Sequence, residues 1–148
     1  MEERQYGKTI LKRYSYEYDR LNRLNTAVYI TPGTTLPFNQ YYNESVEYDL
    51  NGNITHLSRN APSVSSTSYE TIDDLSYEYI GNQLSVIYDD SGNPSGYEGD
   101  GNHIEYDGNG NMLQMKDKMI EEITYNHLNL PNQFTINGQH KNMSYLYR

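Results

Sequence analysis

Oxygen-bearing side chains alternate with glycines in the stretch Asp107-Gly108-Asn109-Gly110-Asn111, a pattern that can wrap a hard cation such as Ca²⁺. The stretch lacks the bidentate glutamate that closes an EF-hand loop. The same residues also suit a tight turn, because Asp and Asn bond nearby backbone and Gly tolerates positive φ. We therefore interpret it as a turn and predict no metal and no cofactor. Asp89, Asp90, Glu98 and Asp100 form a weaker cation candidate of the same kind.

Residues that often act in catalysis are present but are not spaced for it. The four histidines, His56, His103, His127 and His140, have no spacing that would gather metal ligands on one element. The serines between residues 63 and 68 lack the Gly-x-Ser-x-Gly context of a nucleophile. Neither a phosphate loop nor a dinucleotide fingerprint occurs. We predict that the chain is not an enzyme.

Tyrosine is the remaining side chain with a clear capacity for binding, and there are 17 of them. Rings exposed on a sheet face can stack on sugar rings while neighbouring Asp and Asn bond the sugar hydroxyls. The competing interpretation is that the rings pair with one another between strands. A solvent-exposed cluster beside carboxylates would favour glycan binding, and absence of binding on a glycan array would contradict it.

A recurring six-residue motif indicates the elements that position these side chains. Tyrosines at 18, 48, 79, 106, 125 and 147 open the copies, in steps of 30, 31, 27, 19 and 22 residues. Each copy combines an alternating stretch before the Tyr, a turn rich in Asp, Asn and Gly, and an apolar residue after the turn, which predicts a β-hairpin. The copy at Tyr79 is one residue shorter and carries Gly81-Asn82 for a two-residue turn. The motif positions are Tyr18, Asp19, Tyr48, Asp49, Gly52, Tyr79, Gly81, Tyr106, Asp107, Gly110, Tyr125 and Asn126.

Composition sets limits on the class of protein. Ile, Leu, Val and Phe make up about 19% of the chain and the net charge is −9, values that alone would suggest disorder. The tyrosines reverse that expectation, because Tyr favours strands and buries a large ring. The acidic balance argues against a nucleic-acid partner. No cysteine is present, and neither a signal peptide nor a membrane-spanning run is recognised.

The expected organisation is a polar lead-in over residues 1–9 and a repeat region over 10–148. Hairpins are expected near 10–30, 41–59, 74–88, 103–115 and 119–136, with a cut-off copy over 143–148. Within them we expect strands at Ile10–Tyr18, Leu24–Ile30, Tyr41–Tyr48 and Ile54–Arg59, and a linker over 60–68. Further strands are expected at Asp74–Tyr79 and Gln83–Tyr88, and another turn at Asn137-Gly138. The segment 114–122 contains helix formers, but we expect strand and loop there.

The motif Tyr-Asp-x-x-Gly-Asn/Arg followed by an apolar residue resembles the signature of the RHS repeat, also called the YD repeat. The strongest matches are Val46–Thr55 and Ile104–Leu113, with Ile123–Pro131 as a divergent form, and the copies together cover most of the chain from about Lys12. The resemblance implies an all-β fold of antiparallel β-hairpin repeats in a continuous twisted ribbon or partial shell. It also implies a parent protein that is secreted or on the cell surface.

Function is expected to follow from that architecture. The resemblance implies a structural, non-catalytic shell segment of a container for a C-terminal toxin or of a cell-surface protein. Its partners would be the rest of that protein and its cargo, since the chain stops in mid-motif at Tyr147-Arg148. The alternative is a surface carbohydrate-binding or adhesin module using exposed tyrosines. Open edge strands predict self-association. No membrane partner is expected.

Overall fold

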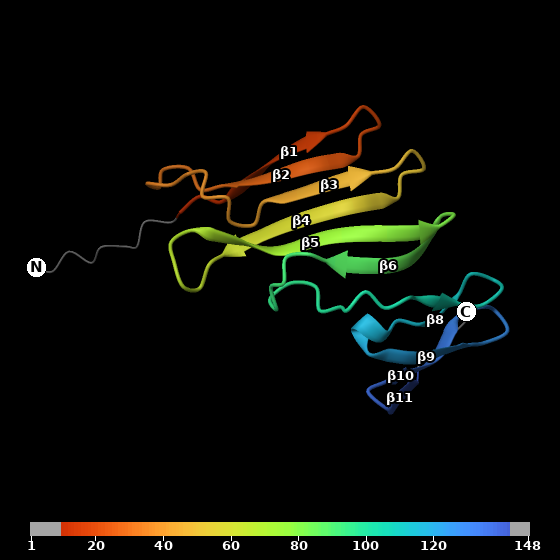
Figure 1. Ribbon diagram of the computed structural model, residues 1–148. Coiled ribbons are helices and arrows are strands. Elements are labelled where there is room, and N and C mark those ends of the chain that lie inside the picture. Colours follow the sequence, from red (N-terminus) through yellow and green to blue (C-terminus); the bar gives the residue numbers. More distant parts are fainter. Residues whose placement is uncertain (1–9, 143–148) are drawn as a thin grey trace, which may run out of the picture.

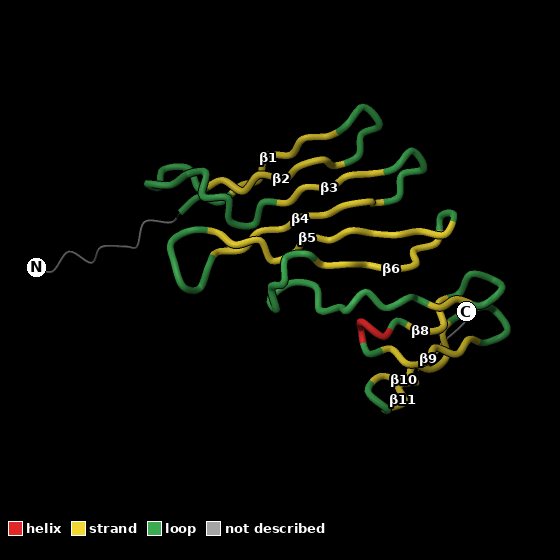
Figure 2. The backbone as a smooth tube through the Cα atoms, viewed as in Figure 1, coloured by secondary structure: helices red, strands yellow, loops and turns green. Residues whose placement is uncertain are grey.

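The computed structural model describes residues 10–142, and these form strands, turns and one 3₁₀ turn (Figures 1 and 2). The lead-in at 1–9 and the cut-off copy at 143–148 lie outside the described residues. Six strands form one antiparallel sheet in chain order: β1 (Arg13–Tyr18), β2 (Leu24–Ile30), β3 (Glu44–Tyr48), β4 (Ile54–Pro62), β5 (Tyr69–Ile80) and β6 (Gln83–Asp89).

The C-terminal part contains two smaller antiparallel sheets. One pairs β7 (Glu105–Tyr106) with β8 (Met112–Gln114). The other places β10 (Pro131–Ile136) between β9 (Ile120–Tyr125) and β11 (Gln139–Asn142), and the 3₁₀ turn η1 (Lys116–Lys118) precedes β9. In Figure 1 the motif turns of all five hairpins lie along one side of the molecule and the longer connections along the other.

The all-β, antiparallel hairpin fold is confirmed for the described residues, and so is the turn at Asn137-Gly138, where both residues have positive φ (50° and 69°). Gly81 has φ 64° in a two-residue turn closed by the pair Ile80 and Gln83, as the shorter copy predicted. Residues 114–122 are strand and loop apart from the single 3₁₀ turn, as expected.

Several predicted boundaries were wrong. β1 begins at Arg13 and not Ile10, and β3 begins at Glu44 because Tyr42 has φ 57°, which no strand accommodates. The predicted linker over 60–68 is shortened to residues 63–68. Although its composition resembles a loop, β4 and β5 continue their ladder through the pair Pro62 and Tyr69.

The predicted continuity of the ribbon was also wrong, because the strand ladder is interrupted twice. Residues 90–104 separate β6 from β7 without forming a strand, and β8 and β9 are joined by one isolated bridge between Met115 and Ile120. Both interruptions involve polar, glycine-rich or lysine-rich sequence that cannot supply a strand's apolar face.

Each motif hairpin carries a β-bulge at the same position. The motif tyrosine pairs with the first residue after the turn, or with the second in the shorter Tyr79 copy, whereas the residue before the tyrosine skips one partner position. One residue of the second strand therefore has no pairing partner on the first strand. Such a bulge bends the strand and increases its twist. The skipped residues are Asn25, Thr55, Ser85, Leu113 and Asn132.

The interior of this single-layered arrangement is small. Val86 and Asp73 are the largest fully buried side chains. The buried apolar residues are Ala27, Tyr29, Ile30, Leu75, Val86, Ile87, Ile104 and Ile123. Within the described residues no helix is long and apolar enough to cross a membrane. With so few buried apolar groups, polar contacts between repeats must contribute much of the cohesion.

Candidate functional site

The motif aspartate, or Asn126 in the fifth copy, organises each full-length turn. In the second copy, Asp49 Oδ1 accepts hydrogen bonds from the backbone N–H of Asn51 (2.9 Å) and Asn53 (2.8 Å), and Oδ2 accepts from the Asn53 amide (2.8 Å). The Asp49 N–H donates to the Asn53 carbonyl at 2.9 Å, and Gly52 takes φ 92°. Asp19 and Asp107 make the same set of bonds with their own turns.

These donors hold the pKa of each motif aspartate below its usual range. The largest cause is the Arg23 backbone N–H for Asp19, the Asn53 amide for Asp49 and the Asn111 amide for Asp107. Both carboxylate oxygens of Asp107 are thus engaged by the turn itself. Residues 10–142 contain no group of three or more His, Asp or Glu side chains placed to hold a metal ion.

The motif tyrosines link each hairpin to the one before it. The hydroxyl of the tyrosine donates to the carbonyl of the residue that pairs with the motif tyrosine of the preceding copy. The four bonds run from Tyr48 to Leu24 (3.0 Å), Tyr79 to Ile54 (2.8 Å), Tyr106 to Leu84 (2.8 Å) and Tyr125 to Met112 (2.7 Å). We call them the tyrosine bridges.

The tyrosine bridges supplement a ladder that is thin at most junctions between copies. β2 and β3 share only two paired positions, β6 and β7 none, and β8 and β9 one isolated bridge. Burial is the largest cause that raises the pKa of Tyr79 and of Tyr106, so both hydroxyls stay protonated as donors well above neutral pH. The tyrosine bridges therefore link neighbouring copies at junctions where strand pairing is sparse or absent.

Polar side chains in the turns add contacts between neighbouring copies. Arg23 donates to the Asp49 carbonyl (3.0 Å) and lies 4.5 Å from the centroid of the Tyr48 ring. The amide of Asn53 contacts Asn82 Oδ1 at 3.3 Å, and the amide of Asn111 contacts Asn129 Oδ1 at 3.3 Å. Contacts of this kind link the first turn with the second, the second with the third, and the fourth with the fifth.

The structure therefore brings the sequence-predicted motif residues into one repeated site. Rings do pair between strands, as one of the two interpretations of the tyrosines held, but the motif tyrosines join the copies through their hydroxyls. The ring contacts involve other tyrosines: Tyr14 with Tyr16 (5.7 Å), Tyr14 with Tyr29 (5.5 Å) and Tyr29 with Tyr42 (5.2 Å between centroids). Sequence reasoning missed the tyrosine bridges. The recurring apolar residue after each turn, six positions after the Tyr or five in the shorter Tyr79 copy, was the signal that could have revealed their acceptors.

A buried carboxylate fixes the long connection over 90–104. Asp73 is fully buried, its Oδ2 lies 2.6 Å from Arg59 Nε, and its Oδ1 accepts the Tyr97 N–H at 2.7 Å. β5 extends beyond its pairing with β6. In that part of the strand the Asp74 carbonyl accepts from the Asp90 N–H, and the Ile72 carbonyl accepts from the Ser91 hydroxyl of the same connection. The connection thereby covers an edge that strand pairing leaves open.

Asp117 in η1 anchors the glycine-rich end of this connection. It accepts bonds from the Asn102 amide (2.6 Å), the Tyr97 hydroxyl (3.1 Å) and the Asp100 N–H (3.2 Å). Burial acts to raise the pKa of Asp117, but these donors outweigh it and hold that pKa below its usual range. Burial, with the bond to Asp117, raises the pKa of Tyr97.

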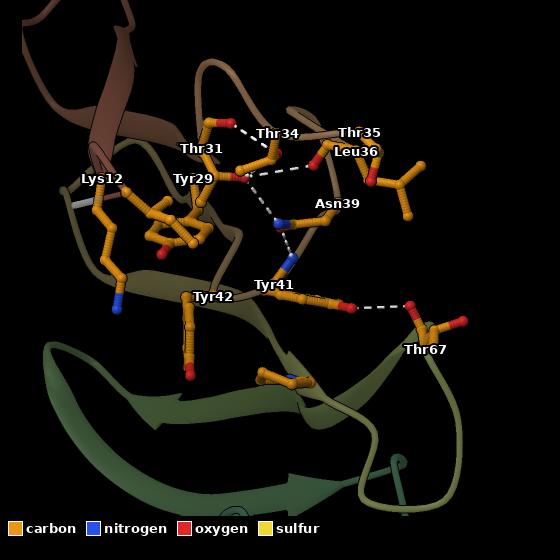
Figure 3. A pocket seen from close by; sticks show the side chains of 12 residues that line it. Lys12, Tyr29, Thr31, Thr34, Thr35, Leu36, Asn39, Tyr41, Tyr42 and Thr67 are labelled. Carbon is orange, nitrogen blue, oxygen red and sulfur yellow. Dashed lines mark hydrogen bonds between the residues drawn. The ribbon is translucent and has the colours of Figure 1, made fainter. Parts of the chain in front are cut away.

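An open cleft of about 500 Å³ lies where the β2–β3 connection meets the β4–β5 connection (Figure 3). Tyr41 closes one side, with its hydroxyl donating to the Thr67 carbonyl at 2.8 Å. Tyr29 and Tyr42 supply aromatic surface, and Thr31 supplies a hydroxyl held by the Asn39 amide at 3.1 Å. The sequence did not single out this cleft, because its residues lie outside the motif.

Comparisons of the chain with protein-family models, with curated proteins and with solved structures find no match.

Proposed function

We propose that this chain is a non-catalytic wall segment of an RHS-type β-hairpin repeat shell, part of a container or of a cell-surface protein. One observation carries the proposal: every described copy after the first repeats the same backward tyrosine bridge. A coupling rule that depends only on the neighbouring copy can be continued indefinitely, which is the property of a repeat array.

The shared bulge supports curvature of such an array. Because the skipped residue recurs at one motif position, each hairpin bends at the same point along its strands. Bulges placed in register are a means of curving a sheet toward closure. A wall made of these hairpins would therefore bend consistently from copy to copy.

The array proposal is tested by a tandem duplication of residues 14–43. This insertion keeps the 30-residue spacing between Tyr18 and Tyr48 and gives the downstream Tyr18 a preceding hairpin. We expect the duplicated chain to gain strand content and free energy of unfolding. Tyr18→Phe in the downstream copy should then cost about 1 kcal/mol, as for an ordinary hydrogen bond, while the same change in the original chain is neutral.

A duplicated segment that stays unfolded, or a downstream Tyr18→Phe that remains neutral, would overturn the array rule. The container role has its own test in the reading frame after the codon for Arg148. Further Tyr-Asp-x-x-Gly copies followed by a non-repeat tail would support it. An immediate stop codon would contradict the container and leave a short hairpin array.

A further inference from the structure

The cleft of Figure 3 is built by a segment that the repeat does not require. The β2–β3 connection, residues 31–43, takes 13 residues, whereas the β4–β5 connection, residues 63–68, takes six. Connections longer than about 12 residues without secondary structure are uncommon and are usually either functional or linker segments. The extra residues supply most of the cleft's lining, including Thr31, Asn39, Tyr41 and Tyr42.

Tyr42 is held in a strained backbone conformation at this cleft. Its φ is 57°, in the left-handed region that is unfavourable for a bulky side chain and costs on the order of 1–3 kcal/mol. The Tyr42 N–H donates to the Asn60 carbonyl (3.1 Å), and the ring packs edge-on against Tyr29. The β2–β3 ladder is formed elsewhere, at Thr26 and Ala27, so strand pairing does not need this strain.

The strain presents an aromatic face to solvent beside fixed polar groups. Tyr42 is 46% exposed, while Tyr29 beneath it is 7% exposed. The hydroxyl of Thr31, a buried residue, contacts Asn39, Thr34 and the Leu36 carbonyl within 3.3 Å, so it fixes the wall of the cleft that carries the Asn39 amide. The hydroxyls of Tyr29 and Tyr42 have no hydrogen-bond partner among the described residues.

The charge of the lining selects the class of ligand. Lys12 is the one charged residue among those that line the cleft, and no carboxylate lines it. The lining therefore offers no carboxylate to a cation and only one positive charge to a polyanion. Tyrosine rings with hydroxyl and amide groups around them suit a neutral polyhydroxylated ring, whose C–H face stacks and whose hydroxyls accept and donate.

We infer that this cleft binds a neutral saccharide, with Tyr42 as the stacking platform and Asn39 and the tyrosine hydroxyls as polar contacts. A volume of about 500 Å³ lies within the range of small-molecule sites. The inference goes beyond the wall proposal, because neither the tyrosine bridges nor the bulges involve the cleft.

The test is saturation-transfer NMR of the whole chain against a panel of neutral methyl glycosides of hexoses, deoxyhexoses and N-acetylhexosamines. Tyr42→Gly removes the ring and suits the left-handed backbone, so it should fold. Tyr16→Ala removes an exposed tyrosine of β1 that lies outside the cleft. We expect transfer to at least one glycoside, affinity at least tenfold weaker in Tyr42→Gly, and no change in Tyr16→Ala.

Two results would overturn the inference. One is the absence of transfer to every glycoside with a chain whose circular dichroism shows a folded sheet. The other is equal loss of binding in Tyr42→Gly and Tyr16→Ala, which would indicate non-specific stacking on exposed tyrosines. Either result leaves the duplication test of the wall proposal unaffected, since that test does not use sugar binding.

Discussion

A single hydroxyl distinguishes the motif tyrosine from phenylalanine, and in this chain that hydroxyl joins one repeat to the next. The ring of Tyr48 also receives the Arg23 guanidinium, so one side chain contacts both the carbonyl and the turn of the preceding copy. The aspartate beside it closes the turn of its own copy. Of these two adjacent residues, the aspartate stabilises the turn of its own hairpin and the tyrosine attaches that hairpin to the preceding one.

Tyr79→Phe should reduce the free energy of unfolding by about 0.5–1.5 kcal/mol, because it removes the bond to the Ile54 carbonyl and keeps the ring. Tyr18→Phe is the matched control, since the Tyr18 hydroxyl has no partner among residues 10–142 and the side chain is 59% exposed. Urea denaturation of both variants makes the measurement. Equal effects at the two positions would contradict the role of the tyrosine bridges.

Acid should weaken the fold through the motif aspartates. Their pKa values are lowered in the folded chain, so their contribution is present above the ordinary Asp pKa of about 3.9 and is lost as pH falls through the lower folded values. Asp49→Asn removes one of these carboxylates, so the melting temperature should fall less steeply with decreasing pH in this variant than in the original chain. Asn126 shows that Asn can accept the same two backbone bonds. An equally steep fall of the melting temperature in the variant and in the original chain would count against this account.

At the scale of elements, the hairpins were predictable and the connections were not. A motif turn is closed by residues within four positions of Asp49, so its signal is local. The path of residues 90–104 depends on Asp73 and Asp117, which lie 24 and 20 residues from the Tyr97 they contact. The bulges were not predicted for a related reason: which residue is skipped depends on the pairing of two strands, and the pattern of one strand does not specify it.

The buried ion pair makes Asp73 a critical anchor of the sheet. Asp73→Ala should cost about 3 kcal/mol, the lower part of the range for breaking a buried pair, because Arg59 is 43% exposed and can regain water. The neighbouring Asp74→Ala should cost less than about 1 kcal/mol, since its contact with His56 lies at the surface. Thermal unfolding of the two variants provides the comparison, and similar losses would refute this ranking.

The long connection packs so closely on β5 that one glycine has no room for a methyl group. A Cβ on Gly96 would lie 1.8 Å from the Ile72 carbonyl oxygen, a backbone atom that cannot yield cheaply. Gly96→Ala should therefore displace the connection and expose the Asp73 region to hydrogen exchange. Gly108→Ala, in open space within a motif turn, should leave exchange unchanged. Protection of residues 90–104 that survives in Gly96→Ala would contradict this packing.

At the scale of the molecule, the exposed edge is the dominant feature. All six residues of β1 are exposed, and its outer edge pairs with no described strand (Figure 1). Such an edge is a template for strand addition, while the net charge of −9 opposes association of copies. We therefore expect self-association that strengthens with added salt.

Tyr16→Lys should suppress that association, because a lysine on an edge strand disfavours pairing. Leu50→Lys makes the same charge change at a fully exposed residue in a turn and should have no effect. Light scattering over a range of protein and salt concentrations distinguishes them. A wild-type chain that stays monomeric at high concentration and high salt would contradict edge-to-edge pairing.

The tyrosine bridges are also compatible with folding during synthesis. Each hydroxyl reaches back to a carbonyl of an earlier copy, so every acceptor has left the ribosome before the tyrosine that needs it. Deleting later hairpins leaves all earlier bridges complete, whereas deleting the first hairpin removes the Leu24 carbonyl that Tyr48 needs. The chain can therefore add finished hairpins in the order of synthesis, each newcomer attaching to a surface that is already in place.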